Sequence, residues 1–238
     1  MPKHGKRYRE HEKQYDSLTA YKPQEGLELV RSFATAKFDE TIDASFKLGI
    51  DPRQADQIVR GTVSLPHGTG QTIRVAVFAQ ADKAREAEAA GADVVGGTEL
   101  TEEIAGGREL DFDIAIATPD MMAEVGKLGR VLGPRGLMPN PKAGTVTVDV
   151  AKAVEEFKAG RVEYRNDRFG NVQVPIGKAS FELEPLVENL GALAAELQRA
   201  RPASAKGRFF RNLSISSTMG PGVKIDPGSL DDLIVASK

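Results

Sequence analysis

The chain has 238 residues and a mass of 25.6 kDa, which suits two domains. Its 40% hydrophobic content and mean hydropathy of -0.31 are typical of a folded protein rather than a disordered or membrane-spanning one. The absence of cysteine excludes disulfides, thiolate zinc sites and cysteine nucleophiles. No apolar run reaches the ~18–20 residues of a membrane span, and no apolar segment follows the basic N-terminus, so we expect a cytoplasmic protein.

The net charge of -2 taken alone argues against a polyanion-binding protein, but the charge is unevenly distributed. Residues 1–70 carry 11 basic and 10 acidic side chains, residues 71–157 carry 9 and 15, and residues 158–238 carry 12 and 9. The acidic excess therefore belongs to the middle segment. Between residues 197 and 225 there are six Lys or Arg and no Asp or Glu, which fits either a solvated basic surface or a phosphate-contact surface.

The first third of the chain predicts a short α+β segment behind a charged arm. Residues 1–20 lack apolar periodicity, and we expect them to form a mobile basic arm. The predicted elements that follow are a helix over about 24–35, a strand over 41–48, a short helix over 51–58 and a strand over 59–65. Apolar and polar residues alternate in the strand over 41–48, which predicts one buried face and one polar face.

After the Pro- and Gly-rich cluster at 66–70 the pattern changes. Apolar strands now alternate with short helices, and the predicted strands cover 73–79, 92–95, 112–117 and 145–148, with helices over 82–90, 99–105, 119–125 and 150–158. Such alternation predicts a parallel sheet covered on both faces, a Rossmann-like three-layer arrangement.

From residue 160 the alternation of apolar and polar residues seen in the first third of the chain returns. The predicted elements are strands over 161–164 and 171–176, a helix over 182–199 and a strand over 209–218. On the last strand, Leu213 and Ile215 share one face, and the other face shows Asn212, Ser214, Ser216 and Thr218.

The first and last thirds share this style and the sign of their charge. We therefore predict a two-domain α/β protein, in which residues 1–70 and 158–238 form a discontinuous α+β domain. Residues 71–157 form an inserted Rossmann-like α/β domain, since insertion at a surface loop is structurally cheap.

Signatures of enzymes are absent from the sequence. The three histidines, His4, His11 and His67, belong to no nucleophile or metal motif, and there is no phosphate loop, dinucleotide fingerprint or nucleophile elbow. We therefore predict no catalytic residue, no metal and no cofactor. An enzyme that binds a nucleotide in the crevice of the inserted domain is the alternative, and it rests on fold analogy alone.

The polar face of the strand over 209–218 is the strongest candidate for a binding site. It ends at Met219-Gly220, where backbone can approach a ligand closely, and hydroxyls with backbone amides suit ribose and phosphate. The strand over 41–48 presents a similar face and is preceded by Lys37 and Phe38. A cation beside an aromatic pairs with phosphate and stacks on a base, whereas the alternative for Phe38 is a hydrophobic anchor at the helix exit.

Six motifs carry a family resemblance, and they are AKFDET at 36–41, KLGIDPR at 47–53, VRGTVSLPHG at 59–68, GPRGLMPNPK at 133–142, GKASF at 177–181 and TMGP at 218–221. Together they resemble the bacterial "L-one" family of the large ribosomal subunit, over about residues 23–225.

The resemblance implies a non-enzymatic protein whose discontinuous domain binds the stalk region of large-subunit rRNA beside the exit site. There the stalk moves with deacylated tRNA as it leaves, and many members also repress translation of their own operon mRNA. The implied partners are large-subunit rRNA, exit-site tRNA, the operon mRNA and other ribosomal components. The sequence does not separate the ribosomal role from the repressor role.

By position, the RNA-contact elements of the family fall on Lys37, Phe38, Glu40, Thr41, Arg165, Asp167, Lys178, Ser217, Thr218, Met219 and Gly220. The resemblance implies that Thr218 and Gly220 contact RNA directly and that Met219 supports them. Gln173 stands where many members carry His, and the segments before Tyr21 and after Pro227 receive no role.

Overall fold

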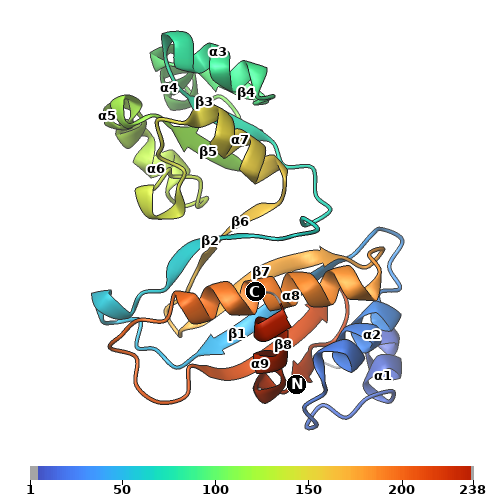
Figure 1. The fold of residues 1–238 in the computed structure, drawn as a ribbon. Coiled ribbons are helices and arrows are strands. Elements are labelled where there is room, and N and C mark those ends of the chain that lie inside the picture. The colour runs from blue at the N-terminus through green and yellow to red at the C-terminus, as the bar shows by residue number, and fades with distance from the viewer. Residues whose placement is uncertain (1–4, 237–238) are drawn as a thin grey trace. The chain divides into compact units, whose positions relative to one another are not determined.

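The computed structural model describes residues 5–236, which fall into two compact units. The first unit combines the chain up to Gly70 with the chain from Val162 onward, and the second runs from Gln71 to Arg161. Both units contain helices and strands, so the predicted α/β class is confirmed (Figure 1).

The first unit is built on a four-stranded antiparallel sheet with the strand order β7-β1-β8-β9, and a separate pair of strands joins β2 to β6. Its strands are β1 (Thr41–Leu48), β2 (Arg60–Ser64), β6 (Arg161–Arg165), β7 (Asn171–Lys178), β8 (Phe210–Ser217) and β9 (Val223–Ile225). Its helices are α1 (Lys6–Glu12), α2 (Pro23–Phe33), α8 (Leu183–Arg199) and α9 (Leu230–Ala236), with 3-10 turns η1 (Ala55–Gln57) and η5 (Pro227–Ser229).

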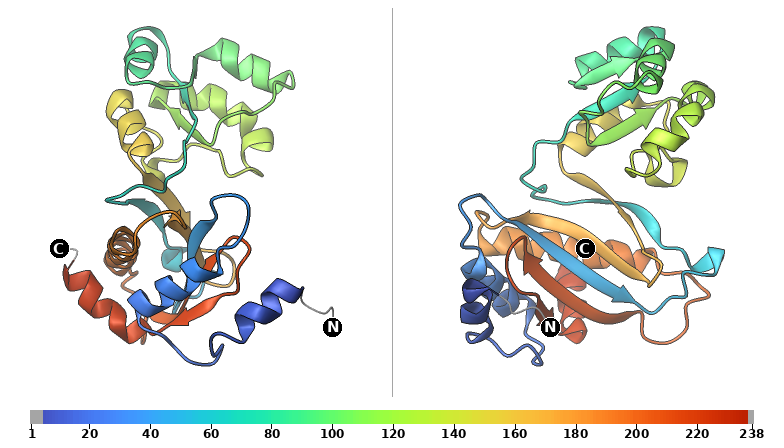
Figure 2. Two further views of the ribbon diagram at one scale, coloured as in Figure 1. Left: turned by 90° about the vertical axis from the view of Figure 1, so that its right-hand side faces the viewer. Right: turned by 180° about the vertical axis from the view of Figure 1, so that it is seen from behind.

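One face of the four-stranded sheet carries the core, and the opposite face is polar. Exposure alternates along the whole of β1, so that Ile42, Ala44 and Phe46 are buried while the residues between them are partly exposed. Leu186 and Leu190 of α8 pack in the same core. Figure 1 shows α8 running along this face, and the view from behind in Figure 2 shows β1, β7 and β8 in front of it. The alternation read from the sequence thus places the core on one side.

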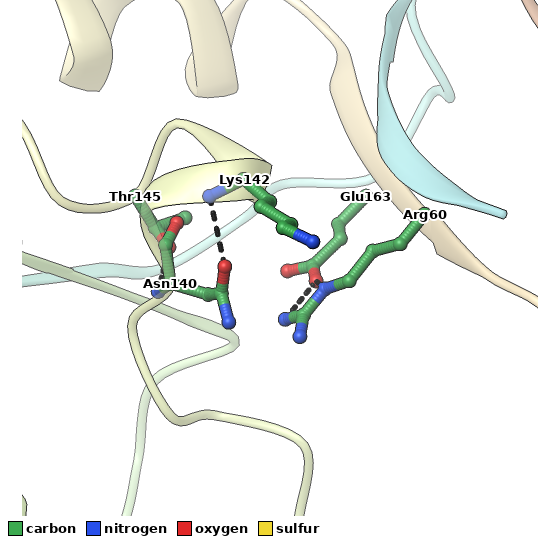
Figure 3. A network of polar contacts seen from close by, with 5 residues as sticks. All are labelled: Arg60, Asn140, Lys142, Thr145 and Glu163. Carbon is green, nitrogen blue, oxygen red and sulfur yellow. Dashed lines mark hydrogen bonds and ion pairs between the residues drawn. The ribbon is translucent and has the colours of Figure 1, made fainter. Parts of the chain in front are cut away.

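The β2–β6 pair carries an ion pair on its surface. Both Nε and Nη2 of Arg60 donate to Oε1 of Glu163, at 2.9 and 2.6 Å (Figure 3). Asn166, just after β6, accepts a hydrogen bond from the backbone N–H of Val59 at 2.8 Å. These contacts tie the start of β2 to the end of β6.

Residues 6–12 form α1, where we expected an arm without regular structure. His11 is buried, its ring centroid lies 4.9 Å from that of Phe33, and the Tyr15 ring lies 5.5 Å from the same Phe33 ring. The segment is highly charged and has only these two rings to pack against Phe33. Two isolated rings do not produce a hydrophobic periodicity, so the sequence pattern did not predict that the segment is ordered. Residues 1–4 of the predicted arm lie outside the described residues.

The second unit is built on a three-stranded parallel sheet with the order β4-β3-β5. Its strands are β3 (Val75–Phe78), β4 (Val94–Gly96) and β5 (Ile114–Ala117). Its helices are α3 (Ala81–Ala89), α4 (Thr98–Ala105), α5 (Met122–Val125), α6 (Gly129–Leu132) and α7 (Val150–Lys158), with 3-10 turns η2 (Pro119–Met121), η3 (Gly126–Leu128) and η4 (Pro141–Ala143).

Two separate cores cover the two faces of this sheet. Val75 and Val77 pack with Phe157 of α7, and Ala76 and Phe78 pack in a second core that includes Leu100 of α4. The apolar run of β3 is therefore buried on both faces, as its continuous hydrophobicity predicts.

The strand predicted over 145–148 is absent, and only an isolated bridge joins Val146 to Ala117. The preceding turn, residues 140–145, is stabilised by its own hydrogen bonds. The side chain of Asn140 accepts the backbone N–H of Lys142 at 2.8 Å, and the backbone N–H of Asn140 donates to Oγ1 of Thr145 at 2.7 Å (Figure 3). The N–H of Ala117 donates to the Thr145 carbonyl at 2.9 Å and the N–H of Thr147 donates to the Ala117 carbonyl at 3.2 Å, so the predicted strand is reduced to this single bridge beside β5.

Candidate nucleic-acid interface

Most of the predicted contact residues meet at one end of the four-stranded sheet. In the register of the strands, Thr41 pairs with Lys178 of β7, and Ile42 pairs with Ser217 of β8. The loop over 34–40, the turn after β7 and the turn after β8 therefore converge there. The predicted residues other than Arg165 and Asp167 lie in these segments or at the strand ends beside them, namely Thr41 of β1, Lys178 of β7 and Ser217 of β8.

Glu40 is a buried connector of the three segments, with 1% of its surface exposed. Its Oε1 accepts the backbone N–H of Ala36 and its Oε2 accepts that of Met219, both at 2.9 Å. Its backbone carbonyl accepts the N–H of Ala179 at 2.8 Å. A carboxylate that accepts backbone N–H groups makes stronger hydrogen bonds than a neutral acceptor. Glu40 therefore positions the contact loops from beneath, and its side chain is not on the surface.

Thr218 extends the pairing of β1 with β8 by one step through its side chain. Its hydroxyl accepts the backbone N–H of Thr41 at 3.0 Å and donates to the Thr41 carbonyl at 3.3 Å. Lys178 Nζ donates to the Thr41 hydroxyl at 2.9 Å. The hydroxyl of Thr218 has its proton engaged within the protein, so it offers a ligand a lone pair and not a proton.

Space, rather than backbone conformation, requires glycine at position 220. A Cβ atom there would lie 2.4 Å from Oγ of Ser217 and 3.5 Å from Cβ of Phe33. Ser217 is itself buried, its hydroxyl has no hydrogen-bond partner among the residues that the structure describes, and its carbonyl accepts the N–H of Gly220 at 3.2 Å. Ser217 thus packs under the turn and does not face a ligand.

The exposed residues at this end include one cation and two apolar side chains, together with Asp39 and Thr218. Lys37 is exposed, Phe38 is 55% exposed and Met219 is 54% exposed. Phe38 is therefore not the hydrophobic anchor that was its alternative interpretation. Exposed apolar side chains next to a lysine suit stacking on bases combined with phosphate contact.

Asp39 and Ser180 are positioning residues that sequence reasoning missed. The Asp39 carboxylate accepts the backbone N–H of Ser180 at 3.1 Å and its hydroxyl at 2.7 Å. Both residues lie inside motifs quoted for the resemblance, at 36–41 and 177–181, so the signal was present. Alternation along strands carries no information about contacts between loops, so it does not predict the pairing of Asp39 with Ser180.

Arg165 and Asp167 lie at the other end of the sheet, where Lys47 pairs with Asn171. Asp167 accepts the backbone N–H groups of Phe169 and Asn171, each at 2.8 Å. Burial raises the pKa of Asp167, but the hydrogen bonds from Asn171 and Phe169 outweigh it, so that the pKa is lowered. Arg165 is exposed. Asp167 shapes the turn before β7, where Arg165, Arg168 and Phe169 are exposed.

We expect Asp167→Asn to reduce stability at neutral pH and to have little effect in acid. A carboxylate whose pKa is lowered by folding stabilises the fold above its unfolded pKa, and this contribution is lost as the pH falls through the folded value. At pH 7 the melting temperature should drop by about 2–4 °C, the equivalent of about one lost hydrogen bond. The difference from wild type should shrink as the pH falls below the ordinary aspartate pKa of 3.8 and through the lowered pKa of the folded carboxyl. A difference that is constant from pH 7 to pH 3 would contradict this role, and the exposed Asp120→Asn serves as control.

No helix among residues 5–236 combines the length and hydrophobicity that crossing a bilayer demands. In the same range, no group of three or more His, Asp or Glu is arranged to hold a metal ion.

The model of the ribosomal protein L1p/L10e family matches residues 30–221, which include every predicted contact residue. The resemblance drawn from the six motifs is thereby confirmed.

Proposed function

Because the chain belongs to the ribosomal protein L1p/L10e family, whose members are non-enzymatic large-subunit proteins that generally bind rRNA, we propose that its first unit binds the stalk region of large-subunit rRNA. The observation that carries this proposal is the end of the sheet at Thr41. There, buried Glu40 fixes loops that present Lys37, Phe38 and Met219 outward. Such a surface recognises folded RNA by its shape and backbone, with apolar groups for stacking.

The distribution of charge supports the same assignment. The acidic excess of the chain lies in residues 71–157, and the two end segments, which form most of the first unit, are net basic. We propose that the two compact units are separate domains, with residues 1–70 and 158–238 as the rRNA-binding domain and residues 71–157 as a Rossmann-like insertion.

The finer biological roles are part of the proposal. We propose that the protein acts on the ribosome in the cytoplasm, assists release of deacylated tRNA from the exit site and represses translation of its own operon mRNA. Family membership supports these roles, since one recognition surface serves any RNA that presents the same shape. A nucleotide-dependent enzyme is not favoured, because the family is structural and the acidic second unit carries no phosphate loop.

The proposal is tested by titrating the full-length protein with a fragment of the rRNA stalk at 50 and 200 mM salt. We expect the affinity to fall with salt, because lysines that contact phosphates release counterions. Lys37→Ala should reduce the slope of log K against log salt by about 1. Lys83→Ala should leave it unchanged, because Lys83 pairs with Glu86 in the acidic unit. Equal affinity of the wild-type protein for a scrambled RNA of the same length would overturn the proposal.

A further inference from the structure

The polar face of the four-stranded sheet carries one carboxylate, Asp43, at a central position. On β1 the polar positions are Thr41, Asp43, Ser45 and Lys47. Across the strands, Asp43 lies opposite Ser216 of β8 and Pro175 of β7. Residues directly opposite in antiparallel strands share a face, so these side chains surround Asp43. Pro175 has no polar group in its side chain, and it lies on an edge strand, where proline is tolerated.

Asp43 is half-buried, and within the described part of the chain its carboxylate makes no hydrogen bond and no ion pair. The lysines that flank it along the face have other oxygen partners, since Lys178 donates to the Thr41 hydroxyl and Lys47 donates to the Phe169 carbonyl. Burial raises the pKa of Asp43 despite the nearby charge of Lys178. A carboxylate that has lost part of its hydration and gained no donor from the protein does not favour the fold, so its presence calls for a reason outside the fold.

The chemistry of a carboxylate decides what can meet it on an RNA-binding face. An ionised carboxylate only accepts hydrogen bonds, and it repels a phosphate. RNA offers two kinds of neutral donor to such an acceptor, the N–H groups of base edges and the ribose 2′-hydroxyl. Lys178 and Lys47 lie on either side along the strand direction, so phosphates are attracted to both sides of Asp43 and excluded from it.

We propose that Asp43 is a specificity-determining residue that accepts a hydrogen bond from a neutral donor of the bound RNA, either a base N–H group or a ribose 2′-hydroxyl. This inference rests on the proposed function and assigns a chemical role to the centre of the sheet face. In this proposal the loops at the Thr41 end bind the RNA. The Asp43 carboxylate then favours the position of the RNA on the sheet face in which a hydrogen-bond donor, not a phosphate, lies over β1.

The test compares wild type with Asp43→Asn by titration with the rRNA stalk fragment. Loss of a hydrogen bond to a charged acceptor should weaken binding about tenfold or more. If Asp43 only repelled phosphates, the same variant would bind more tightly, so the sign of the effect separates the two roles. The exposed Glu184→Gln on α8 removes the same charge from the same unit and should leave affinity within about twofold. The melting temperature of Asp43→Asn should be equal to or higher than that of wild type, which excludes unfolding as the cause.

The donor is then identified with modified RNA. One series of stalk fragments replaces single riboses by 2′-deoxyribose, and a second replaces single bases by analogues without the amino group. A position where the modification weakens binding of the wild type but not of Asp43→Asn is the donor, and the series in which it occurs gives its type. Absence of such a position from both series would overturn the inference.

Failure of the proposed function is distinguishable from failure of the inference. If the wild type shows no preference for the stalk fragment over a scrambled RNA, both are wrong. If it shows that preference and Asp43→Asn binds equally well or more tightly, only the role of Asp43 is wrong.

Discussion

A Thr218→Val variant is expected to bind the rRNA stalk fragment roughly 5- to 30-fold more weakly than wild type. Valine keeps the shape of threonine but cannot accept the N–H of Thr41 or donate to its carbonyl, and these contacts are worth about 1–2 kcal/mol together. Their loss separates the start of β1 from the turn after β8. The same substitution also removes the hydroxyl lone pair that is left for RNA. Calorimetric or gel-shift titration measures the change.

The matched control is Thr218→Ser, which retains the hydroxyl and should bind within about threefold of wild type. Glu102→Ala lies on α4 of the second unit and should have no effect on affinity. Three equal affinities, for the valine variant, the serine variant and the wild type, would show that the turn after β8 is not part of the RNA interface.

A Glu40→Gln variant is expected to lose both stability and RNA affinity. The carboxylate accepts one backbone N–H on each oxygen, and an amide presents one oxygen and one NH₂ group to the same two donors. One partly buried N–H, either of Ala36 or of Met219, is then left without an acceptor, at a cost of about 1–3 kcal/mol. The melting temperature should fall by about 2–10 °C.

The affinity of Glu40→Gln separates a positioning role from a purely structural one. Measured well below the melting temperature, the folded variant should still bind RNA about tenfold or more weakly, because Met219 and the loop over 34–40 lose their shared anchor. A substitution in the α8 core such as Leu190→Ala should lower the melting temperature by a similar or larger amount without changing the affinity of the folded protein. If Glu40→Gln binds as wild type does while folded, Glu40 is a stability residue only.

The regular elements of this protein were largely predictable from the sequence. Alternation over 41–48 predicted β1 without error, and the apolar runs of the second unit predicted its parallel strands, because both patterns follow from which faces are buried. The predictions fell short where order depends on a few specific contacts. The short strand β9 and the helix α9 are examples, since Val223–Ile225 has only three residues and lies among turn-forming prolines and glycines.

The sequence predicted which residues form the candidate site, but not which of them are buried supports and which are exposed. Motif positions identified Glu40, Ser217 and Thr218 together, yet the structure buries the first two and leaves the third exposed. A sequence pattern predicts which side chains along a strand are buried. At the end of a strand, burial depends instead on the loops that pack there, and the pattern does not show these. For Asp43 the sequence pattern was sufficient to place the residue on the polar face. Only the three-dimensional contacts show that its carboxylate has no hydrogen bond or ion pair within the described residues.

The buried anchor of the RNA loops also constrains the order of events during synthesis. Glu40 is made early, but Met219, whose N–H its second oxygen accepts, is made only after the entire second unit. Until then the carboxylate lacks one of its donors, and β1 lacks β8 as its neighbour. A growing chain therefore cannot complete the proposed RNA-binding surface until synthesis has passed Met219.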